Sequence, residues 1–481
     1  MSFDKYFKPA PAIRPRLNLG CLLDIPTGKY HTGKDGESIL NGGLAYFTGI
    51  GGRGNMFKST VMHMMFLRIM DRYGAPGLSY DTETSLTLAR LYALAAKMPN
   101  IGGVDLEEEG LLRLTDSTEH LGNDWFELLK QAARERAKEK SNWATTPFVD
   151  KKGEPVRMPR PMVAECDSLS MMPIESIETI YNKNEIGESG MNVEAMRASA
   201  AKSQMLMQVP NLTASTGCFL MVSAHVGDSI QMDPYAPNQK KLSFMKNSIK
   251  FKQVPEKFTF LTNNLWLCVN AEVFQNRNTK GPEFPAHPDD NNPGDTDLQL
   301  VTLLNLRAKD GPTGMPLQLV VSQREGVLIG LSELHHLRSH GKFGMGGHDR
   351  AYYLELYPEV SMQRTTARST IEGDVKLQRA LEITSELCQI HNLWADLEPG
   401  LFCEPKDLYE GLKSKGYDWD ILLDTRGYWV FDPKKEEKPY LSTMDLLKMN
   451  LGTYTPKWYE GVVKAKAKAD SQGKEKADKT K

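Results

Sequence analysis

Short apolar runs alternate with longer stretches of helical periodicity along most of this chain. The short runs predict strands at 44–48, 78–81, 162–167, 218–225, 265–270, 317–322 and 352–357. The longer stretches predict a helix at 59–72, which is apolar on nearly all sides and therefore buried, and another at 193–209. Strands that alternate with helices favour a mainly parallel central sheet flanked by helices, so the predicted fold class is α/β.

The alternation occupies residues 41–385, and the segments on either side differ from it. Residues 1–40 are rich in proline, glycine and charge, which indicates an N-terminal arm and lead-in. Residues 386–460 predict a small C-terminal α/β appendage, with helices at 407–416 and 442–450 and a strand at 426–431. Residues 461–481 are basic and of low complexity, which predicts a disordered tail.

Composition narrows the class of protein. The 481 residues are 40% hydrophobic, which is enough for a buried core, and they carry 59 basic against 61 acidic side chains. Such a balance excludes a protein that coats DNA by bulk charge alone, although it permits a local basic surface. We find no apolar run of about 18 residues and no secretory signal, so a cytoplasmic protein is expected. The six cysteines are widely spaced and indicate reduced thiols.

A glycine-rich segment, Gly49–Thr60, lies between an apolar strand and the buried helix. From Gly52 to Ser59 it fits the Walker pattern G-x-x-x-x-G-K-[ST], except that Phe57 replaces the last glycine. Backbone N–H groups and the positive helix end at such a turn bind phosphates. We expect Lys58 to reach the β- and γ-phosphates of ATP, and Ser59 to ligate Mg²⁺. The alternative is a surface turn followed by a chance Lys-Ser pair. The predicted nucleotide-binding residues are Gly52, Arg53, Gly54, Asn55, Met56, Phe57, Lys58, Ser59 and Thr60.

Two carboxylates follow other predicted strands. Asp167 ends the strand at 162–167 and is predicted to hold Mg²⁺ together with Ser59. Glu83 follows the strand at 78–81, where it could orient the attacking water as a general base. Each has a plainer interpretation, Asp167 as a turn cap and Glu83 as a solvated residue of a helix start. Because ligands of open α/β sheets bind at the carboxyl ends of strands, the joint occurrence favours catalytic roles for Lys58 and Glu83.

Lysines gather in the loop at 227–264, where residues 240–257 contain six lysines and one glutamate. Phenylalanines at 244, 251, 258 and 260 lie among them. Lysines neutralise phosphates and aromatic rings stack on unpaired bases, so the segment predicts an interface for single-stranded DNA. The alternative is a solvated loop whose phenylalanines pack into the core. The predicted DNA-binding residues are Lys240, Lys241, Lys246, Lys250, Phe251, Lys252 and Lys257.

In their order along residues 15–385, these motifs resemble the RecA-type recombinases, most closely the bacteriophage UvsX branch. Phe57-Lys58-Ser59 reproduces the ending of the phosphate loop in that branch. The segment 80–83 is similar to the one that carries the family's general base, and 167–172 to its Walker B strand and the residues after it. Ser223-Ala-His225 looks like the position that senses the γ-phosphate, which implies a catalytic role for His225.

The resemblance implies a RecA-like P-loop ATPase core at 41–385, with DNA-binding loops around 227–264. It implies a recombinase that uses ATP and Mg²⁺, forms a homo-oligomeric filament on single-stranded DNA, and exchanges strands with duplex DNA in recombination, repair and replication. Single-strand-binding and mediator proteins would be accessory partners, and a phage protein would act in the host cytoplasm. A ring-forming helicase or translocase with the same core, or a nucleotide-binding scaffold without turnover, is the alternative.

Three further groups of residues are weaker candidates. Arg364 and Arg368 could act in trans on the nucleotide of a neighbouring subunit. Arg90 and Tyr92 lie near the expected position of an adenine-stacking residue, without a clear match to it. Histidines at 335, 336, 340 and 348 suggest zinc, but their spacing is irregular and no cysteine is close in sequence, so we expect no metal there.

Overall fold

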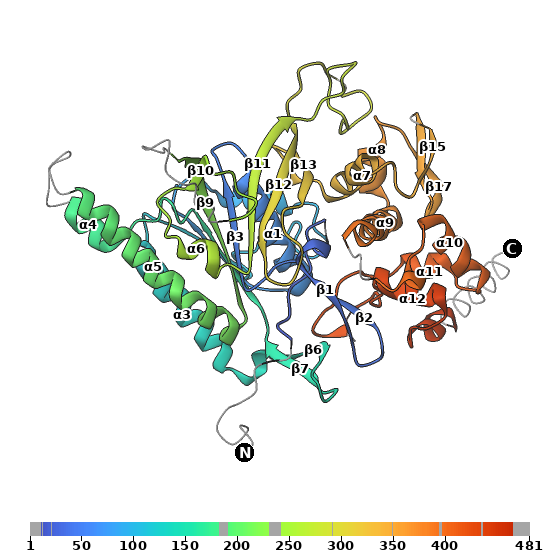
Figure 1. Cartoon of the computed structure of the whole chain (residues 1–481), viewed down its shortest axis with the longest axis horizontal. Helices are drawn as coiled ribbons and strands as arrows, with labels where there is room; N and C mark the ends of the chain where they lie inside the picture. Colours follow the sequence, from blue (N-terminus) through green and yellow to red (C-terminus); the bar gives the residue numbers. More distant parts are fainter. Residues whose placement is uncertain are drawn as a thin grey trace.

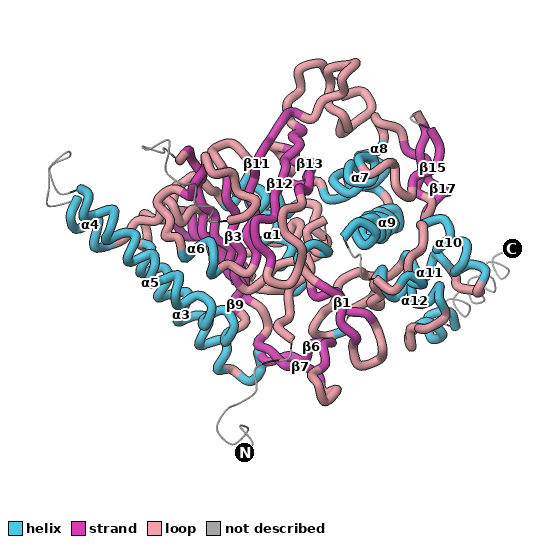
Figure 2. Tube along the Cα trace, viewed as in Figure 1, coloured by secondary structure: helices cyan, strands magenta, loops and turns pink. Residues whose placement is uncertain are grey.

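A ten-stranded sheet crosses the molecule, with helices on both faces and a largely helical region beside it (Figures 1 and 2). The computed structural model describes residues 11, 13–20, 22–181, 191–229, 242–290, 292–348, 350–393, 397–433 and 436–464. The strand order is β14 (Gly326–Val327), β13 (Pro316–Ser322), β12 (Leu298–Ala308), β11 (Asn264–Val273), β3 (Phe47–Gly52), β9 (Cys218–Asp228), β8 (Met162–Asp167), β4 (Gly77–Asp81) and β5 (Leu112–Asp116), while β10 (Ile249–Phe251) pairs with β9.

The sheet is mixed, and the sequence predicts most of the strands in its parallel part. Neighbouring strands from β11 to β5 are parallel. Beyond β11 the sheet continues through antiparallel pairs to β12, β13 and β14, and β10 is antiparallel to β9. The predicted strands that became β4, β8, β9, β11 and β13 are confirmed, whereas β5 and β12 were not anticipated. The fold class is therefore α/β, with a mixed central sheet.

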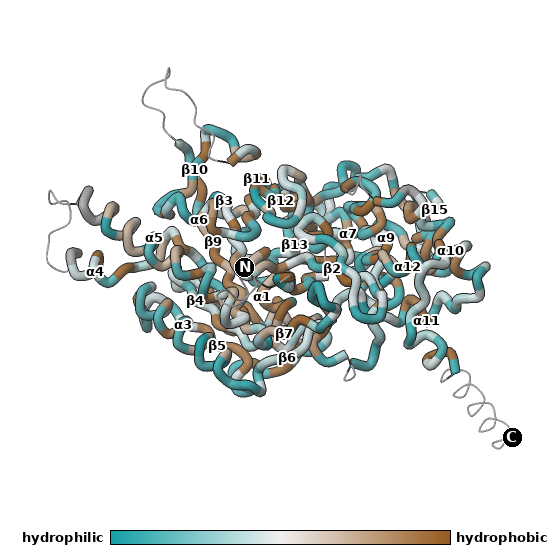
Figure 3. The backbone as a smooth tube through the Cα atoms, turned by 60° about the horizontal axis from the view of Figure 1, so that its bottom comes forward, coloured by the Kyte–Doolittle hydropathy of each residue, from teal (hydrophilic) through white to brown (hydrophobic). Residues whose placement is uncertain are grey.

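Each face of the sheet is covered by a separate hydrophobic cluster. Successive strand residues point to opposite faces, so Val163 packs with α1 (Lys58–Tyr73) and Ala164 packs on the other side with α5 (Met191–Thr216). Figure 3 shows hydrophobic positions along β9 and hydrophilic ones along the outer helix α3 (Gly122–Lys138). Both long predicted helices are confirmed as α1 and α5. Among the described residues, no helix has the length and apolar character needed to cross a membrane.

The first core strand begins later than predicted. The sequence places a strand at 44–48 and a glycine turn after it, but β3 runs through the glycines to Gly52. A side chain at Gly51 would meet the ring of Phe251 at 2.5 Å, and one at Gly49 would meet Leu265 and Phe258. These glycines therefore allow neighbouring side chains to lie against the strand, and the turn itself is confined to residues 53–57.

The C-terminal region has its own hydrophobic cluster, which includes Leu334, Leu381 and Leu446. The strand predicted at 352–357 is confirmed only in part, because the chain turns after Leu354 and forms two antiparallel strands, β16 and β17, of a separate small sheet. The predicted helices at 407–416 and 442–450 are confirmed as α10 and α12. The elements of the region are α7 (Ile329–Ser339), β15 (Met345–His348), β16 (Ala351–Leu354), β17 (Tyr357–Met362), α8 (Ala367–Gly373), α9 (Val375–Leu393), η4 (Pro399–Leu401), α10 (Pro405–Ser414), α11 (Trp419–Leu423) and α12 (Thr443–Leu451).

The expected α/β character of the appendage is not found in its described residues. The strand predicted at 426–431 is wrong, since only Arg426 forms an isolated bridge, to Tyr440. Trp429 and Phe431 of that segment are buried instead, and Trp429 donates its Nε1–H to the carbonyl oxygen of Arg16 at 3.1 Å. The predicted boundary between the core and the appendage, between residues 385 and 386, lies inside α9. Except for residues 461–464, the predicted tail lies outside the described residues.

The N-terminal lead-in is ordered by contacts with the C-terminal region. Leu17 and Leu23 are fully buried, and Gln389 of α9 donates to the carbonyl oxygen of Leu22 at 2.9 Å. The described residues of the lead-in therefore belong to the core. The elements not yet named are η2 (Ile25–Thr27), β1 (Lys29–Thr32), β2 (Ser38–Asn41), α2 (Leu88–Ala95), η3 (Lys140–Asn142), β6 (Trp143–Val149), β7 (Pro155–Pro159), α4 (Glu175–Tyr181) and α6 (Lys257–Leu261).

Candidate functional site

The loop from Arg53 to Phe57 joins β3 to the start of α1. Asn55 and Phe57 both adopt left-handed backbone conformations, with φ of 59° and 58°. Left-handed residues of this kind turn backbone N–H groups toward the concave side of a loop and form anion-binding nests. Phe57 thus takes the conformation that the missing glycine would favour. No side chain caps α1, and its first turn has no acidic residue, so the positive helix end is left for an anion.

Lys58, the first residue of α1, and Asp167, the last residue of β8, meet at the carboxyl edge of the parallel strands. The Nζ of Lys58 lies 4.0 Å from Oδ1 of Asp167, and the two residues are only 7% and 9% exposed. Ser223 of β9 donates its hydroxyl to the same Asp167 oxygen. Lys58 is therefore held at the sheet edge by an opposite charge. Ser59 and Asp167 provide the hard oxygen ligands that suit Mg²⁺.

Glu83 and His225, which are far apart in sequence, form a contact beside this pair. His225 Nε2 lies 2.7 Å from Oε1 of Glu83, and Ser168 donates its hydroxyl to the same oxygen at 3.2 Å. The side chains of Glu83 and His225 are 36% and 25% exposed, so both are open to solvent. Asp81 fixes the turn that carries Glu83 by accepting its N–H at 2.9 Å. The structure thus brings all four predicted polar residues, Lys58, Glu83, Asp167 and His225, to one sheet edge.

A buried polar pair, His63 of α1 and Glu165 of β8, connects this helix to the sheet. Glu165 is completely buried, and its carboxylate contacts His63 Nδ1 at 2.9 Å and accepts the Ser79 hydroxyl at 2.8 Å. Burial disfavours the charged imidazolium, but the carboxylate beside it raises the pKa of His63 above its ordinary value. This contact ties α1 to β8 and thereby fixes the position of Lys58 relative to Asp167.

Ser170 connects the site to the lysine-rich loop. Its Oγ accepts the N–H of His225 at 2.8 Å and donates to the carbonyl oxygen of Lys252 at 2.9 Å. The N–H of Lys252 in turn donates to the carbonyl oxygen of His225 at 2.9 Å. A continuous set of hydrogen bonds therefore runs from Glu83 through His225 to Lys252.

A second connection to the same loop is made by Lys202 of α5. Its buried ammonium donates to the carbonyl oxygens of Leu169 and Ser170 at 2.7 and 3.0 Å, and to that of Gln253 at 3.4 Å. Burial lowers the pKa of Lys202 to about 8. The lysine therefore fastens the segment after β8 to the end of the lysine-rich loop.

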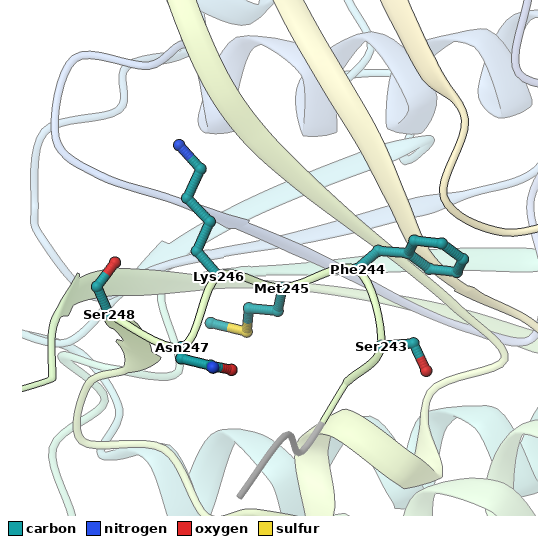
Figure 4. A pocket seen from close by; sticks show the side chains of 6 residues that line it. All are labelled: Ser243, Phe244, Met245, Lys246, Asn247 and Ser248. Carbon is teal, nitrogen blue, oxygen red and sulfur yellow. The ribbon is translucent and has the colours of Figure 1, made fainter. Parts of the chain in front are cut away.

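The described part of the lysine-rich loop presents several charges to solvent. Lys246, Lys250 and Lys252 are exposed, whereas Lys257 is half-buried in α6. Residues Ser243–Ser248 line a surface hollow, from which Lys246 and Phe244 extend in different directions (Figure 4). The predicted residues Lys240 and Lys241 lie outside the described residues.

The phenylalanines of this loop divide into two pairs. Phe251 was predicted to bind DNA, but its ring packs edge-on against Phe258, 5.5 Å away between centroids. Phe258 itself is fully buried. Phe244 and Phe260 are each 46% exposed and are the rings that remain accessible for stacking. The DNA-binding role of Phe251 stays a prediction, and the structure adds that its ring lies against Gly51 of β3.

Other predicted residues are engaged within the chain. Arg368 is 3% exposed and ion-pairs with Glu325 at 2.7 Å, so its side chain does not project toward a neighbouring subunit. Arg364 donates to the carbonyl oxygen of Pro282 at 2.7 Å. Arg53 pairs with Asp228 at the end of β9. The remaining candidates, Arg90 and Tyr92, donate to Arg324 and Asp105 respectively.

Sequence reasoning gave no role to the residues that hold the predicted ones in place, although Ser223 lies in a motif that it singled out. Each of these residues contacts one of the four predicted polar residues or the segment that carries it. They are Ser223, Asp81, Ser170 and Lys202. A polar residue inside an otherwise apolar strand, such as Ser223, was the available signal. Neither a scan against protein-family models nor a search of curated proteins finds a match to this chain.

Proposed function

We propose that the chain is an ATP-dependent recombinase with a RecA-like core, which binds single-stranded DNA as a filament and promotes homologous pairing and strand exchange. The observation that carries the proposal is the meeting of Lys58, Asp167, Glu83 and His225 at one edge of the parallel strands. Ligands of open α/β sheets bind at that edge. The resemblance in motif order to the RecA-type recombinases supports the choice of recombinase within this class.

In the proposed reaction, the protein's own groups position ATP and a water molecule. Lys58 and the N–H groups at the start of α1 neutralise the negative charge of the β- and γ-phosphates. Ser59 and Asp167 are the residues that would hold Mg²⁺, which when bound supplies further positive charge to the phosphate oxygens. Glu83 accepts a proton from the attacking water as the oxygen of that water bonds to the γ-phosphorus and ADP leaves.

The hydrogen bonds from Glu83 to Lys252 support a coupling between nucleotide and DNA. His225 contacts Glu83 through its side chain and Lys252 through its backbone. A change in the partners of Glu83 is therefore expected to alter the position of the strand β10 that carries Lys250. We propose that ATP orders the lysine-rich loop for DNA binding and that hydrolysis releases it.

Electron microscopy of the full chain with single-stranded DNA and a slowly hydrolysed ATP analogue tests this function. A recombinase forms helical filaments that require both DNA and nucleotide. Rings with a central channel would favour a helicase or translocase instead. Dispersed particles under all conditions would contradict filament formation. Filaments that form equally well without nucleotide would contradict the proposed coupling between nucleotide and DNA binding.

A further inference from the structure

Two histidines and a cysteine from different helices meet in the C-terminal region, away from the proposed nucleotide site. His336 belongs to the last turn of α7, His340 follows that helix, and Cys388 lies in α9. One potential ligand atom from each residue lies within 4.8 Å of the other two. The sequence predicts no metal here, because the four histidines are irregularly spaced and no cysteine is close to them along the chain. In the folded chain, however, Cys388 lies beside His336 and His340, which are separated by three residues.

The buried histidine of this cluster has an unsatisfied nitrogen. Nε2 of His336 is buried and has no hydrogen-bond partner in the described part of the chain, and the residue is only 7% exposed. Buried polar atoms in proteins are nearly always paired, so this imidazole nitrogen is available to a partner from outside the chain, an ion or a water. The rings of His336 and His340 lie 4.1 Å apart between centroids, which places both beside the same space.

The second histidine is arranged as metal ligands usually are. Nδ1 of His340 lies 2.8 Å from the carbonyl oxygen of His336. When Nδ1 donates its proton to that oxygen, the lone pair of Nε2 is left available for a metal. His340 is exposed, so an ion has access to the cluster from solvent. Cys388 is fully buried, and its sulfur accepts a hydrogen bond from Asn392 at 3.5 Å.

We propose that His336, His340 and Cys388 bind a divalent transition metal of the zinc class, with water in the fourth position. Imidazole nitrogen and thiolate sulfur are the ligands that zinc prefers, and a His-x₃-His pair has a spacing found in zinc sites. Zinc bonds of about 2.0–2.3 Å place tetrahedral ligand atoms roughly 3.3–3.6 Å apart, so binding requires the three side chains to move together by at most about 1 Å. Cys388 binds as the thiolate, and its proton is released to solvent.

Such an ion would fasten α7 to α9. These two helices already pack together in the C-terminal hydrophobic cluster. A ligand that binds only the folded chain stabilises it by mass action, so the metal is expected to raise the temperature of unfolding. The proposed role is therefore structural and is independent of the nucleotide site.

Cobalt binding to the full chain tests the proposal, because a cobalt–thiolate bond gives a charge-transfer absorption in the near ultraviolet. The chain is stripped with a chelator and titrated with Co²⁺, then with Zn²⁺ in competition. We expect one Co²⁺ per chain with the thiolate absorption, its displacement by Zn²⁺, and a higher unfolding temperature with either metal. Absence of the thiolate absorption in the wild type would overturn the proposal.

Matched variants distinguish this cluster from other thiols and histidines. Cys388→Ser is expected to abolish the thiolate absorption, whereas Cys403→Ser and His391→Gln, which alter residues outside the cluster, are expected to retain it. His340→Ala changes an exposed residue and leaves the core intact, and it is expected to weaken Co²⁺ binding by more than about tenfold. Unchanged affinity in His340→Ala, or a retained absorption in Cys388→Ser, would contradict the assignment.

Discussion

At the scale of single residues, the candidate site is shaped by the backbone conformation of Phe57 and by the contacts of Lys58 and Glu83. Phe57 departs from the Walker pattern, yet its φ of 58° is the one that the pattern's glycine would supply. Lys58 is buried and faces Asp167, while Glu83 is held by His225. The sequence predicts the four polar residues that meet at this edge of the sheet. It does not predict Ser223 or Ser170, because their roles depend on strand neighbours that only the fold brings together.

Replacement of Phe57 tests the importance of its left-handed backbone. Phe57→Gly is expected to bind ATP about as well as the wild type, because glycine adopts positive φ without strain. Phe57→Val is expected to bind ATP more weakly than either, since branching at Cβ adds strain in the left-handed conformation beyond that already present with phenylalanine. Nucleotide titrations measure both affinities. Equal affinities for the two variants would show that the backbone conformation at this position is unimportant.

Glu83→Gln tests the proposed general base. The amide cannot accept a proton from water, so ATP turnover is expected to fall by roughly 10²–10⁴-fold while ATP affinity changes little. Glu108→Gln, which alters another exposed acid, serves as the control. Steady-state turnover and nucleotide titration together separate catalysis from binding. Turnover close to that of the wild type would remove Glu83 from the reaction.

At the scale of elements, apolar patterning predicts the buried parallel strands and fails where packing against a distant segment decides the structure. Strand β8 is found at the predicted residues because every side chain in it is buried. Strand β3 is longer than predicted, since its glycines accommodate Phe251 from the lysine-rich loop. Cys388 joins His336 through the packing of α7 on α9, which spacing along the chain could not indicate.

Charge reversal in β10 and beside it tests the DNA interface. Lys250→Glu together with Lys252→Glu is expected to weaken single-stranded DNA binding and to lower its salt dependence, by about 0.7 in the slope of log affinity against log salt for each lost phosphate contact. The backbone hydrogen bonds of Lys252 do not require its side chain, so the coupling to His225 is retained. Filter binding over a range of salt concentrations gives both quantities.

The matched control reverses two exposed lysines elsewhere, Lys140→Glu with Lys415→Glu, which leaves the same net charge change. This pair is expected to leave the salt dependence as it is in the wild type. An equal loss of affinity in both double variants would assign binding to overall charge and would remove the lysine-rich loop from the interface.

At the scale of the whole molecule, the N-terminal lead-in and the C-terminal appendage contact one another. Asp445 of α12 accepts the N–H of Ser38 at 2.7 Å and that of Ser442 at 3.2 Å, and it is 1% exposed. Tyr440 donates its hydroxyl to the carbonyl oxygen of Ser38 at 2.9 Å. The appendage and the lead-in are distant in sequence, so their association was not predictable from either segment alone.

This contact predicts a pH-dependent contribution to stability. Burial raises the pKa of Asp445 to about 6, despite the N–H groups that favour its ionised form. A raised pKa means that the folded chain holds the Asp445 proton more tightly than the unfolded chain does. The resulting stabilisation is greatest at pH values below the pKa of the unfolded chain, and it is lost as pH rises through about 6. The stability advantage of the wild type over Asp445→Asn is therefore expected to shrink between pH 4 and pH 7, by roughly 1–3 kcal/mol.

Urea unfolding of both proteins at several pH values within this range gives the difference directly. Because the two chains share every other titrating group, their common pH dependence cancels in the comparison. A difference that stays constant, or one that grows with pH, would contradict a protonated Asp445 in the folded chain.

The most direct test of the proposed function is the rate of ATP hydrolysis with and without single-stranded DNA, in the wild type and in Lys58→Ala. The wild type is expected to hydrolyse ATP faster when DNA is present, because hydrogen bonds connect the lysine-rich loop to Glu83 through His225. Lys58→Ala is expected to lose both the basal and the stimulated rate, since it removes the buried positive charge beside Asp167. Equal rates with and without DNA in the wild type, or an undiminished rate in Lys58→Ala, would contradict the account.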